Sequence, residues 1–339
     1  MITLGNHIDD IDIVVLWLDG NDSEWLMQRR EYELREGRAP MNPARYREWH
    51  IFKYWFRAVE KYAPWIRTVH LVTCGHLPSW LNCDHPKLHI VRHSDFMPAE
   101  YLPTFNGMAI EVNIHKIPGL SEHFIYSQDD IFFADYVKPS DFFKDGMPCE
   151  ALMLDNNLPL RDSHFWNPAM NTIAIQSNFS KRKCIRENFF KWINWRYGSY
   201  NVKNMLLLPW PRFEGFHLPH VMFNANISLI QEAWEKEYKA LETTSLHKFR
   251  DNFDLSFELF RDWHLVTGRF APRSPWISEN ISLNDKESTL GRIRLIFSKR
   301  KRKMLCINDN EWIENLELVT NGICSILSAT FPDKSSFEK

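Results

Sequence analysis

Two adjacent carboxylates, Asp129 and Asp130, lie between two apolar segments and are the clearest candidates for chemistry in the chain. The apolar run 124–126 comes just before them, and a second apolar run, 131–133, follows. Charged side chains are rarely buried without a partner. At the end of a strand they would face the crevice where open α/β sheets bind ligands, and a diphosphate held by a divalent cation is one ligand that fits there. A solvated turn with an aspartate cap is the simpler alternative.

A second acidic turn follows the first apolar run of the sequence. Residues 11–18 are apolar except for Asp12 and include several β-branched side chains, which predicts a buried strand, and Asp19-Gly20-Asn21-Asp22 follow at once. Asp19 and Asp22 would then lie at the carboxyl end of a strand. The same residues are equally typical of an ordinary turn.

Two histidines, His217 and His220, flank Leu218 and Pro219. No cysteine or third histidine stands at zinc-ligand spacing, and the proline disfavours a regular helix between the pair. One histidine acting as a general base is the sharper hypothesis, because an unperturbed imidazole titrates near ~6.5. A hydrogen-bonded structural histidine is the alternative.

Strands that alternate with helices predict an α/β fold, with a largely parallel sheet flanked by helices. We expect strands at 11–18, 69–73, 88–91, 124–126, 151–154 and 304–310. We expect helices at 24–36, 49–62, from 78–81, 181–197, 228–240 and 253–266. The predicted parts are an N-terminal α/β core (1–155), an irregular or helical insertion (156–215) and a mainly helical C-terminal part (216–339).

Composition excludes several classes of protein. The 339 residues carry a net charge of −2, so no global charge points to nucleic acid. Neither G-x-G-x-x-G nor G-x-x-x-x-G-K-[ST] occurs, which leaves the usual dinucleotide and P-loop sites without support. The six cysteines form no C-x-x-C, and no apolar run reaches the ~18 residues of a membrane span. We therefore expect a soluble, cytoplasmic protein.

One stretch is strongly basic. Seven of the twelve residues from Arg292 to Lys303 are Lys or Arg, and none is acidic. This stretch could attract a polyanionic acceptor or an anionic membrane surface, or it could be an exposed helix end.

Four blocks of the sequence resemble the Stealth family of capsular polysaccharide phosphotransferases, which includes the catalytic subunit of the animal N-acetylglucosamine-1-phosphotransferase. The first block is IDIVVLWLDGND at 11–22. The second contains EKYAPWIRTVHLVTCGHLPSWLN, LPTFNGMAIE and HFIYSQDDIFF, the third HLPH and HKFRD, and the fourth LCIND. They follow the family's order over nearly the whole chain, and the second is the most specific.

The resemblance implies a Rossmann-like fold and assigns roles to particular residues. Asp129 and Asp130 match the family's paired acidic positions at the catalytic centre. Glu111, His217 and Arg250 match its active-site Glu, His and Arg. Seven further positions are expected near the substrate: Asp19, Gly20, Arg45, Asn106, Gln128, Asn308 and Asp309.

Two departures bear on selectivity for the sugar or the nucleotide. Gln128 stands where family members commonly have Asn, and Asp19 stands where the animal enzyme has Asn. The large inserted modules of the animal enzyme are absent, which fits a bacterial capsule enzyme.

The reaction that the resemblance implies is transfer of a sugar 1-phosphate from a nucleotide sugar, expected to be a UDP-sugar, to a hydroxyl of a growing capsular or exopolysaccharide. A phosphodiester forms and a nucleoside monophosphate leaves. Mg²⁺ or Mn²⁺ held by Asp130, with Asp129, would bridge the diphosphate, and Arg250 would bind phosphate oxygens. His217 would take the acceptor's proton, or Glu111 would be the base or orient His217.

Two other functions remain open from the sequence. A metal-dependent glycosyltransferase uses the same fold, acids and nucleotide sugar but releases a nucleoside diphosphate. A non-catalytic polysaccharide-binding protein would use the aromatic residues. The expected partners are a nucleotide sugar and a polysaccharide acceptor, with no nucleic acid, and with peripheral association at the inner membrane or a capsule-assembling complex through Arg292–Lys303.

Overall fold

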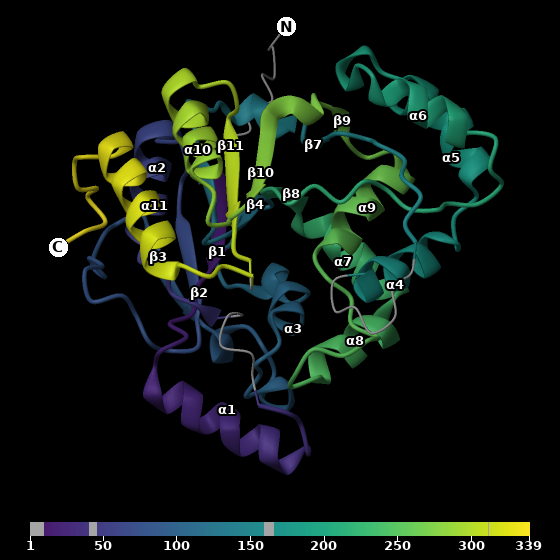
Figure 1. Ribbon diagram of the computed structural model, residues 1–339. Coiled ribbons are helices and arrows are strands. Elements are labelled where there is room, and N and C mark those ends of the chain that lie inside the picture. The colour runs from purple at the N-terminus through teal and green to yellow at the C-terminus, as the bar shows by residue number, and fades with distance from the viewer. Residues whose placement is uncertain (1–9, 41–45, 159–165, 311) are drawn as a thin grey trace, which may run out of the picture.

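A five-stranded, mostly parallel sheet forms the centre of the molecule (Figure 1). The computed structural model describes residues 10–40, 46–158, 166–310 and 312–339. The strand order is β3-β2-β1-β4-β8, and β8 alone runs antiparallel to its neighbour. The strands are β1 (Ile11–Leu16), β2 (Val69–Thr73), β3 (Leu88–Arg92), β4 (His123–Gln128) and β8 (Phe223–Asn226).

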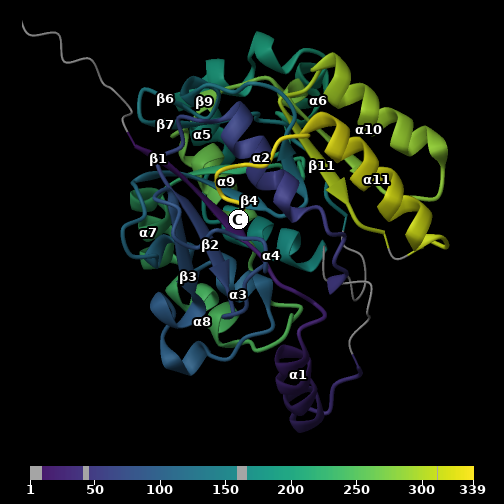
Figure 2. The ribbon, with the colours of Figure 1, turned by 90° about the vertical axis from the view of Figure 1, so that its left-hand side faces the viewer.

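Helices cover both faces of this sheet, which explains why its central strands are apolar almost throughout. Ile11, Ile13 and Val15 of β1 pack into a core on one face, and Val14 packs into a core on the other. The first face carries α2 (Phe52–Tyr62), α10 (Glu287–Lys299) and α11 (Leu316–Thr330) (Figure 2). The second carries α3 (Gly107–Glu111), α7 (Ile227–Lys236), α8 (Tyr238–Leu246) and α9 (Glu258–Thr267).

Two smaller sheets extend the centre. In one, β10 (Ser278–Ser282) pairs with β11 (Met304–Asn308), which pairs antiparallel with β5 (Ile131–Phe133). The other has the order β6 (Phe143–Lys144), β7 (Met147–Glu150) and β9 (Ala271–Pro272). Since β5 directly follows β4, the first small sheet ties the C-terminal part to the carboxyl end of the central sheet.

Four helices lie farther from the sheet. Helix α1 (Ser23–Arg35) follows β1 and lies at the bottom of Figure 1. Helices α5 (Lys181–Trp192) and α6 (Tyr200–Leu207) form a pair at the upper right, and α4 (Trp166–Gln176) lies below them, next to α9. Among the residues described, no helix is both long enough and apolar enough to cross a bilayer.

The predicted fold class is confirmed: the main sheet is largely parallel, and helices flank it. The C-terminal part is mainly helical, as expected, and it also supplies β8, β9, β10 and β11. The apolar core on the α2 face joins residues from 11 to 143 with residues from 281 to 337. The domain limits at 155 and 215 stay a prediction.

Two predicted elements are wrong. Residues 78–81 form turns instead of a helix, because Leu81 pairs with Glu338 of the C-terminal tail. Residues 151–154 are not a strand of the main sheet: within them only Leu154 makes a bridge, to Phe216. The fifth strand of that sheet is β8, whose alternating Asn residues are buried and hide it from an apolar-run search.

A buried aspartate on β1 joins three segments of the central sheet. Asp12 is fully buried, and its carboxylate accepts hydrogen bonds from Arg67 Nε at 2.8 Å and from Ser121 N at 2.9 Å. His70 Nε2 of β2 lies 3.0 Å from Asp12 Oδ2. Burial by itself would raise the pKa of Asp12, but the hydrogen bonds from Arg67, His70 and Ser121 outweigh it and lower the pKa to about 2.

The Asp12→Asn substitution should therefore lower the free energy of unfolding by roughly 2 kcal/mol at neutral pH. The folded-state pKa is below the unfolded value of 3.8, so the stabilisation is present above that pH and is lost as the pH falls through about 2. Urea unfolding of both proteins across this range should show the difference shrinking as the pH falls. Asp10→Asn is the matched control, because the Asp10 side chain is 60% exposed and lies 3.9 Å from Arg67. Equal effects of the two substitutions would contradict the assignment.

Candidate active site

A cavity of about 510 Å³ opens where β1 and β4 end. The two strands are parallel neighbours, and Leu16 pairs with Gln128. Trp17 and Leu18 therefore leave β1 beside the point where Asp129 and Asp130 leave β4, and all four residues line the cavity. This is the edge at which open α/β sheets bind ligands.

Asp129 and Asp130 form the two-residue turn between β4 and β5. The turn is fixed from both sides, because β4 lies in the central sheet and β5 in the small sheet with β11. The backbone of Asp130 accepts a hydrogen bond from Ile307 N at 2.9 Å, and Cys306 Sγ lies 3.5 Å from Asp130 Oδ2. Asp130 Oδ1 is buried and has no hydrogen-bond partner among the described residues.

The folded protein disfavours the ionised forms of Asp129 and Asp130. Burial, with the neighbouring charges of Asp130 and Glu48, raises the pKa of Asp129 to about 8. Burial also raises the pKa of Asp130, although the nearby His220 opposes the shift. A bound cation would relieve both effects, and carboxylate oxygens are the ligands that Mg²⁺ and Mn²⁺ prefer. The unpartnered Asp130 Oδ1 fits such an ion.

A second set of candidate ligands shares Asp130. One atom each of Asp130, His220 and Cys306 lie within 4.8 Å of one another. An oxygen, a nitrogen and a sulfur together suit a softer ion such as Zn²⁺ better than Mg²⁺. The sequence prediction paired Asp129 with Asp130 and did not include the other two.

Glu111 enters the cavity from the other side of β4. It ends α3, and its carboxylate accepts hydrogen bonds from Tyr126 Oη at 3.0 Å and from Phe257 N at 3.2 Å. Burial and the charge of Glu258 raise its pKa to about 7, while these hydrogen bonds and Arg250 act in the opposite direction. A carboxyl that titrates near neutral pH is suited to proton transfer.

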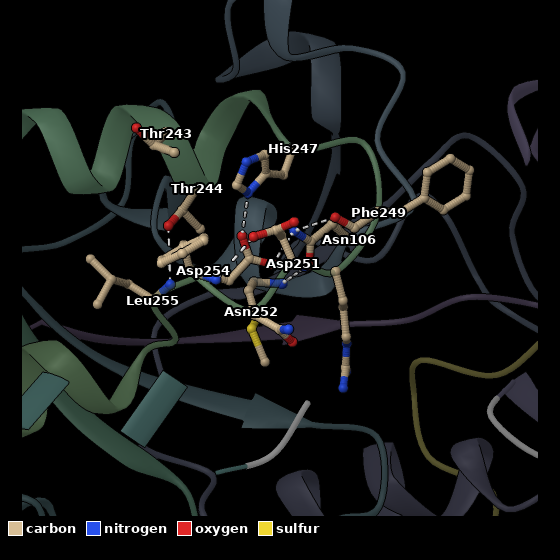
Figure 3. A network of polar contacts seen from close by, with 12 residues as sticks. Asn106, Thr243, Thr244, His247, Phe249, Asp251, Asn252, Asp254 and Leu255 are labelled. Carbon is tan, nitrogen blue, oxygen red and sulfur yellow. Dashed lines mark hydrogen bonds and ion pairs between the residues drawn. The ribbon is translucent and has the colours of Figure 1, made fainter. Parts of the chain in front are cut away.

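Arg250 lines the same cavity, on a loop that a buried polar network holds in place (Figure 3). At the centre of the network, Asp254 accepts hydrogen bonds from Asn106 Nδ2 and from Asp251 N, both at 2.8 Å, and its other oxygen lies 2.7 Å from His247 Nδ1. Asn106 also caps α3 and is fully buried, and it does not line the cavity. The structure thus places this expected substrate residue behind Arg250 and Glu111, where it positions both.

The two histidines separate in the structure. His220 lines the cavity, with its Nε2 3.0 Å from Gln128 Oε1 and 3.9 Å from Asp130 Oδ2. His217 does not line it: its Nδ1 lies 3.5 Å from Asp155 Oδ2, and 41% of its side chain is exposed. Burial and the charge of Arg261 lower the pKa of His217, while Asp155 opposes the shift. The sequence prediction chose His217, and the structure places His220 nearer the acids.

The turn Asp19–Asp22, which follows β1, lies beside the cavity. Asp19 Oδ1 accepts a hydrogen bond from Asn21 N, and Asp22 caps α1, so both do the work of turn residues. A Cβ at Gly20 would come within 1.8 Å of the backbone oxygen of Tyr46, so only glycine allows this close approach of the two segments. Arg45 lies outside the described residues.

The end of β11 completes the wall opposite Glu111. Asn308 and Asp309 both line the cavity, and Asp309 Oδ1 accepts a hydrogen bond from Arg47 Nη1 at 3.1 Å. Burial raises the pKa of Asp309, although Arg47 opposes the shift.

The sequence did not single out several residues that line the cavity, among them Glu48, Glu258, Arg47 and Trp17. Glu48 and Arg47 precede α2 and belong to no helix or strand, so no periodic pattern could mark them. Glu258 opens α9 and resembles an ordinary charge in the first turn of a helix. The HLPH motif marked His220 as a candidate, but the spacing within the motif could not show whether His217 or His220 lies in the cavity.

These features define an α/β protein with a cavity that is strongly acidic and also presents two arginines, at the carboxyl edge of its sheet. Residues 45–150 match the family model described as Stealth protein CR2, conserved region 2. The chain is 40% identical to an exopolysaccharide phosphotransferase, cps2G, of Lactiplantibacillus plantarum, over 97% of this chain and 96% of that protein. It is 38% identical to a capsular polysaccharide phosphotransferase, WcwK, of Streptococcus pneumoniae, over 98% of this chain and 99% of that protein.

The chain therefore belongs to the Stealth family, and it is an enzyme of the phosphotransferase class. A solved structure of the galactosyltransferase LgtC is also similar, at 9% identity and a TM-score of 0.40, covering 94% of this chain and 95% of that one. At that level of likeness the similarity does not bear on the reaction.

The raised pKa of Glu111 predicts a stability penalty that depends on pH. The folded-state value of about 7 is above the unfolded value of 4.5, so stability falls as the pH rises from 4.5 to about 7. Glu111→Gln lacks this penalty and should be more stable than the wild type at pH ~8, by up to about 3 kcal/mol. Melting temperatures measured by circular dichroism should show the gap closing towards pH ~5.

Glu235→Gln, at an exposed position of α7, serves as the control and should change little at either pH. A difference for Glu111→Gln that stays constant with pH would contradict the raised pKa.

Proposed function

We propose that this enzyme transfers a sugar 1-phosphate from a nucleotide sugar, expected to be a UDP-sugar, to a hydroxyl of a growing capsular or exopolysaccharide. A phosphodiester forms and a nucleoside monophosphate is released. One observation carries the proposal: Glu111, the Asp129–Asp130 pair and Arg250 come from distant parts of the chain and line a single cavity. The names of the relatives add support, since they act on capsular polysaccharides and exopolysaccharides.

In the donor, one oxygen bridges two phosphorus atoms, one of which carries the sugar. The proposed reaction breaks the bond between this bridging oxygen and the phosphorus that carries the sugar. The acceptor oxygen attacks that phosphorus, the nucleoside monophosphate leaves with the bridging oxygen, and the sugar keeps its C1–O bond. Negative charge grows on the phosphoryl oxygens and on the leaving group. Catalysis is then mainly positioning and electrostatic stabilisation.

An arginine of the cavity would bind phosphate, and the acids of the cavity would bind a cation. Arg250 would bind phosphate oxygens through its planar, forked guanidinium group. Asp130, with Asp129, would hold Mg²⁺ or Mn²⁺, and the ion when bound supplies positive charge beside the diphosphate. Gln128 keeps His220 beside Asp130, which limits where this imidazole can reach.

The acceptor's proton has two candidate receivers. Glu111 lies inside the cavity with a pKa of about 7. His217 lies at the outer end of the segment 217–220, whose inner end, His220, lines the cavity. We propose His217 as the base on the strength of its match to the family's histidine, and Glu111, which lines the cavity itself, as the alternative base or the group that orients His217.

We also propose that the enzyme works in the cytoplasm, at the periphery of the membrane or of a capsule-assembling complex. All six cysteines are free thiols, which suits a reducing compartment.

The nature of the released nucleotide tests the proposed reaction. The purified enzyme is incubated with a panel of nucleotide sugars, a capsule-type acceptor and Mg²⁺ or Mn²⁺. Nucleoside monophosphate should be released, phosphorus NMR should detect a phosphodiester in the polymer, and EDTA should stop both. Release of nucleoside diphosphate would identify a glycosyltransferase instead. Saccharide binding without any nucleotide release would identify a non-catalytic binding protein.

Substitutions of the two histidines and of Glu111 separate the candidate bases. His217→Ala should lower kcat ~10²–10⁴-fold and leave the Kd for the nucleotide sugar nearly unchanged, because a general base acts in the transition state. His220→Ala is the comparison: it removes a group beside Asp130 and should weaken donor binding as well. Near-normal turnover of His217→Ala, together with a large loss in Glu111→Gln, would assign the base to Glu111.

A further inference from the structure

The pair of helices α5 and α6 exposes an unusual number of large apolar side chains in one short segment. Within the segment 181–212, here called the α5–α6 surface, Phe190 is 83% exposed, Trp195 79% and Leu206 69%. Four other apolar side chains of the segment are exposed as well: Phe189, Val202, Met205 and Trp210. Figure 1 shows the two helices lying together at one corner of the molecule.

These side chains are not a core left open by poor packing. The same segment has an inner side, where Trp192 and Tyr197 are fully buried in an apolar cluster with Phe213 and Phe216. Lys181 ties the pair together, since its Nζ donates a hydrogen bond to Leu207 O at 2.7 Å. The exposed apolar side is therefore a second face of a well-anchored element, and grouped exposed apolar residues of this kind mark an interaction site.

The charge of the segment indicates what it contacts. It holds eight Lys and Arg residues and a single acid, Glu187, whereas the whole chain has a net charge of −2. Three of the eight, Lys181, Lys191 and Lys203, make contacts within the protein, which leaves five bases for a partner. Arg182, Lys183 and Arg186 are exposed along α5. The guanidinium of Arg196 lies 4.6 Å from the ring centre of the exposed Trp195, so a basic and an aromatic group lie together there.

The basic stretch Arg292–Lys303 is a weaker candidate for the same role. Its bases largely serve the fold: Arg292 and Arg302 both pair with Glu279, and Lys303 pairs with Asp141 at 2.6 Å. Leu295 is its single strongly exposed apolar side chain among the described residues. Charge without apolar anchors gives weaker attachment to a bilayer than the two combined.

We propose that the α5–α6 surface lies on an anionic lipid bilayer. Trp195 and Trp210 would sit at the level of the headgroups, Phe190 and Leu206 would reach the acyl boundary, and the arginines and lysines would contact anionic headgroups. The inference goes beyond the phosphotransfer and holds whichever nucleotide is released.

The position of this surface gives the contact a purpose. The ring of Tyr200, in α6, lies 6.1 Å from the ring of His217. Lys203, also in α6, pairs with Asp155, which in turn lies beside His217 Nδ1. From His217 the chain continues to Leu218 and His220, and Leu218 and His220 line the cavity. A bilayer beneath α5 and α6 would therefore lie close to the approach to the active site.

Vesicle flotation of the full-length enzyme tests the proposal without any substrate. The wild type should float with phosphatidylglycerol vesicles and much less with phosphatidylcholine vesicles. F190S/W195S/L206S, which removes three exposed apolar anchors, should weaken the binding at least tenfold. M27S/L34S/W312S is the matched control, because these side chains are 69%, 65% and 79% exposed elsewhere on the molecule. It should bind like the wild type.

A pair of charge variants makes the same comparison for the bases. R182S/K183S/R186S should weaken binding to phosphatidylglycerol, whereas R294S/K299S/K301S, which removes the same charge from the C-terminal stretch, should change it little. Melting temperatures and nucleotide release in detergent solution should be unchanged in all four variants, because the substituted side chains are exposed and outside the cavity.

Three outcomes would overturn the proposal: no flotation of the wild type, equal losses in the variants and their controls, or a surface that only mediates dimerisation or protein capture. None of these outcomes would bear on the identity of the released nucleotide.

Discussion

The enzyme depends on holding mutually repelling carboxylates close together in one partly buried cavity. Asp129 and Asp130 are adjacent in the chain, Glu48, Glu111, Glu258 and Asp309 line the same cavity, and burial raises the pKa of most of these acids. Left free, such groups would turn outwards to be solvated. The folded chain prevents this because the two central acids form the shortest link between β4 and β5, strands that belong to two different sheets.

The surrounding architecture supplies the rigidity that this arrangement requires. Trp55 of α2 donates from Nε1 to Ser127 Oγ at 3.3 Å, two residues before Asp129, and both residues are buried. Backbone pairing with β11 fixes the far side of the turn through Ile307 N. On the opposite wall, the Asn106–Asp254 hydrogen bond joins the start of α3 to the loop that carries Arg250. Strands, helices and a buried polar network thus each hold one side of the cavity.

The cavity is not uniformly acidic, and this asymmetry suits a particular kind of ligand. Arg250 and Arg47 enter from separate loops, and Arg47 pairs with Asp309. A ligand that brings both phosphate groups and a metal ion would meet a partner for each charge. Such a ligand would replace repulsion between acids inside the protein with attraction, so the raised pKa values and the arginines have one common explanation. The cost is stability, since each buried acid opposes folding at neutral pH.

The chain by itself was sufficient for the class of fold and for the position of the acidic turn. Both follow from local patterns: apolar runs of strand length, helical stripes such as Trp55, Val59 and Tyr62, and two acids placed between apolar segments. The sequence pattern did not predict β8, because its alternate residues are asparagines and not apolar residues. These asparagines have polar partners inside the protein: Asn224 Nδ2 donates to Cys149 O at 2.7 Å. The segment 78–81 was misjudged because its pairing partner, Glu338, lies at the other end of the chain.

Which residues line the cavity is decided only in three dimensions. Sequence could not tell that Asn106 is buried behind the cavity, that His220 and not His217 lies beside Asp130, or that Glu48 joins the acids. The reason is physical. Periodicity reports which side of its own helix or strand a residue occupies, whereas a shared cavity depends on how separate elements pack together. That packing is decided by long-range pairings, here β4 with β1, β5 with β11, and Asn106 with Asp254, which no local pattern encodes.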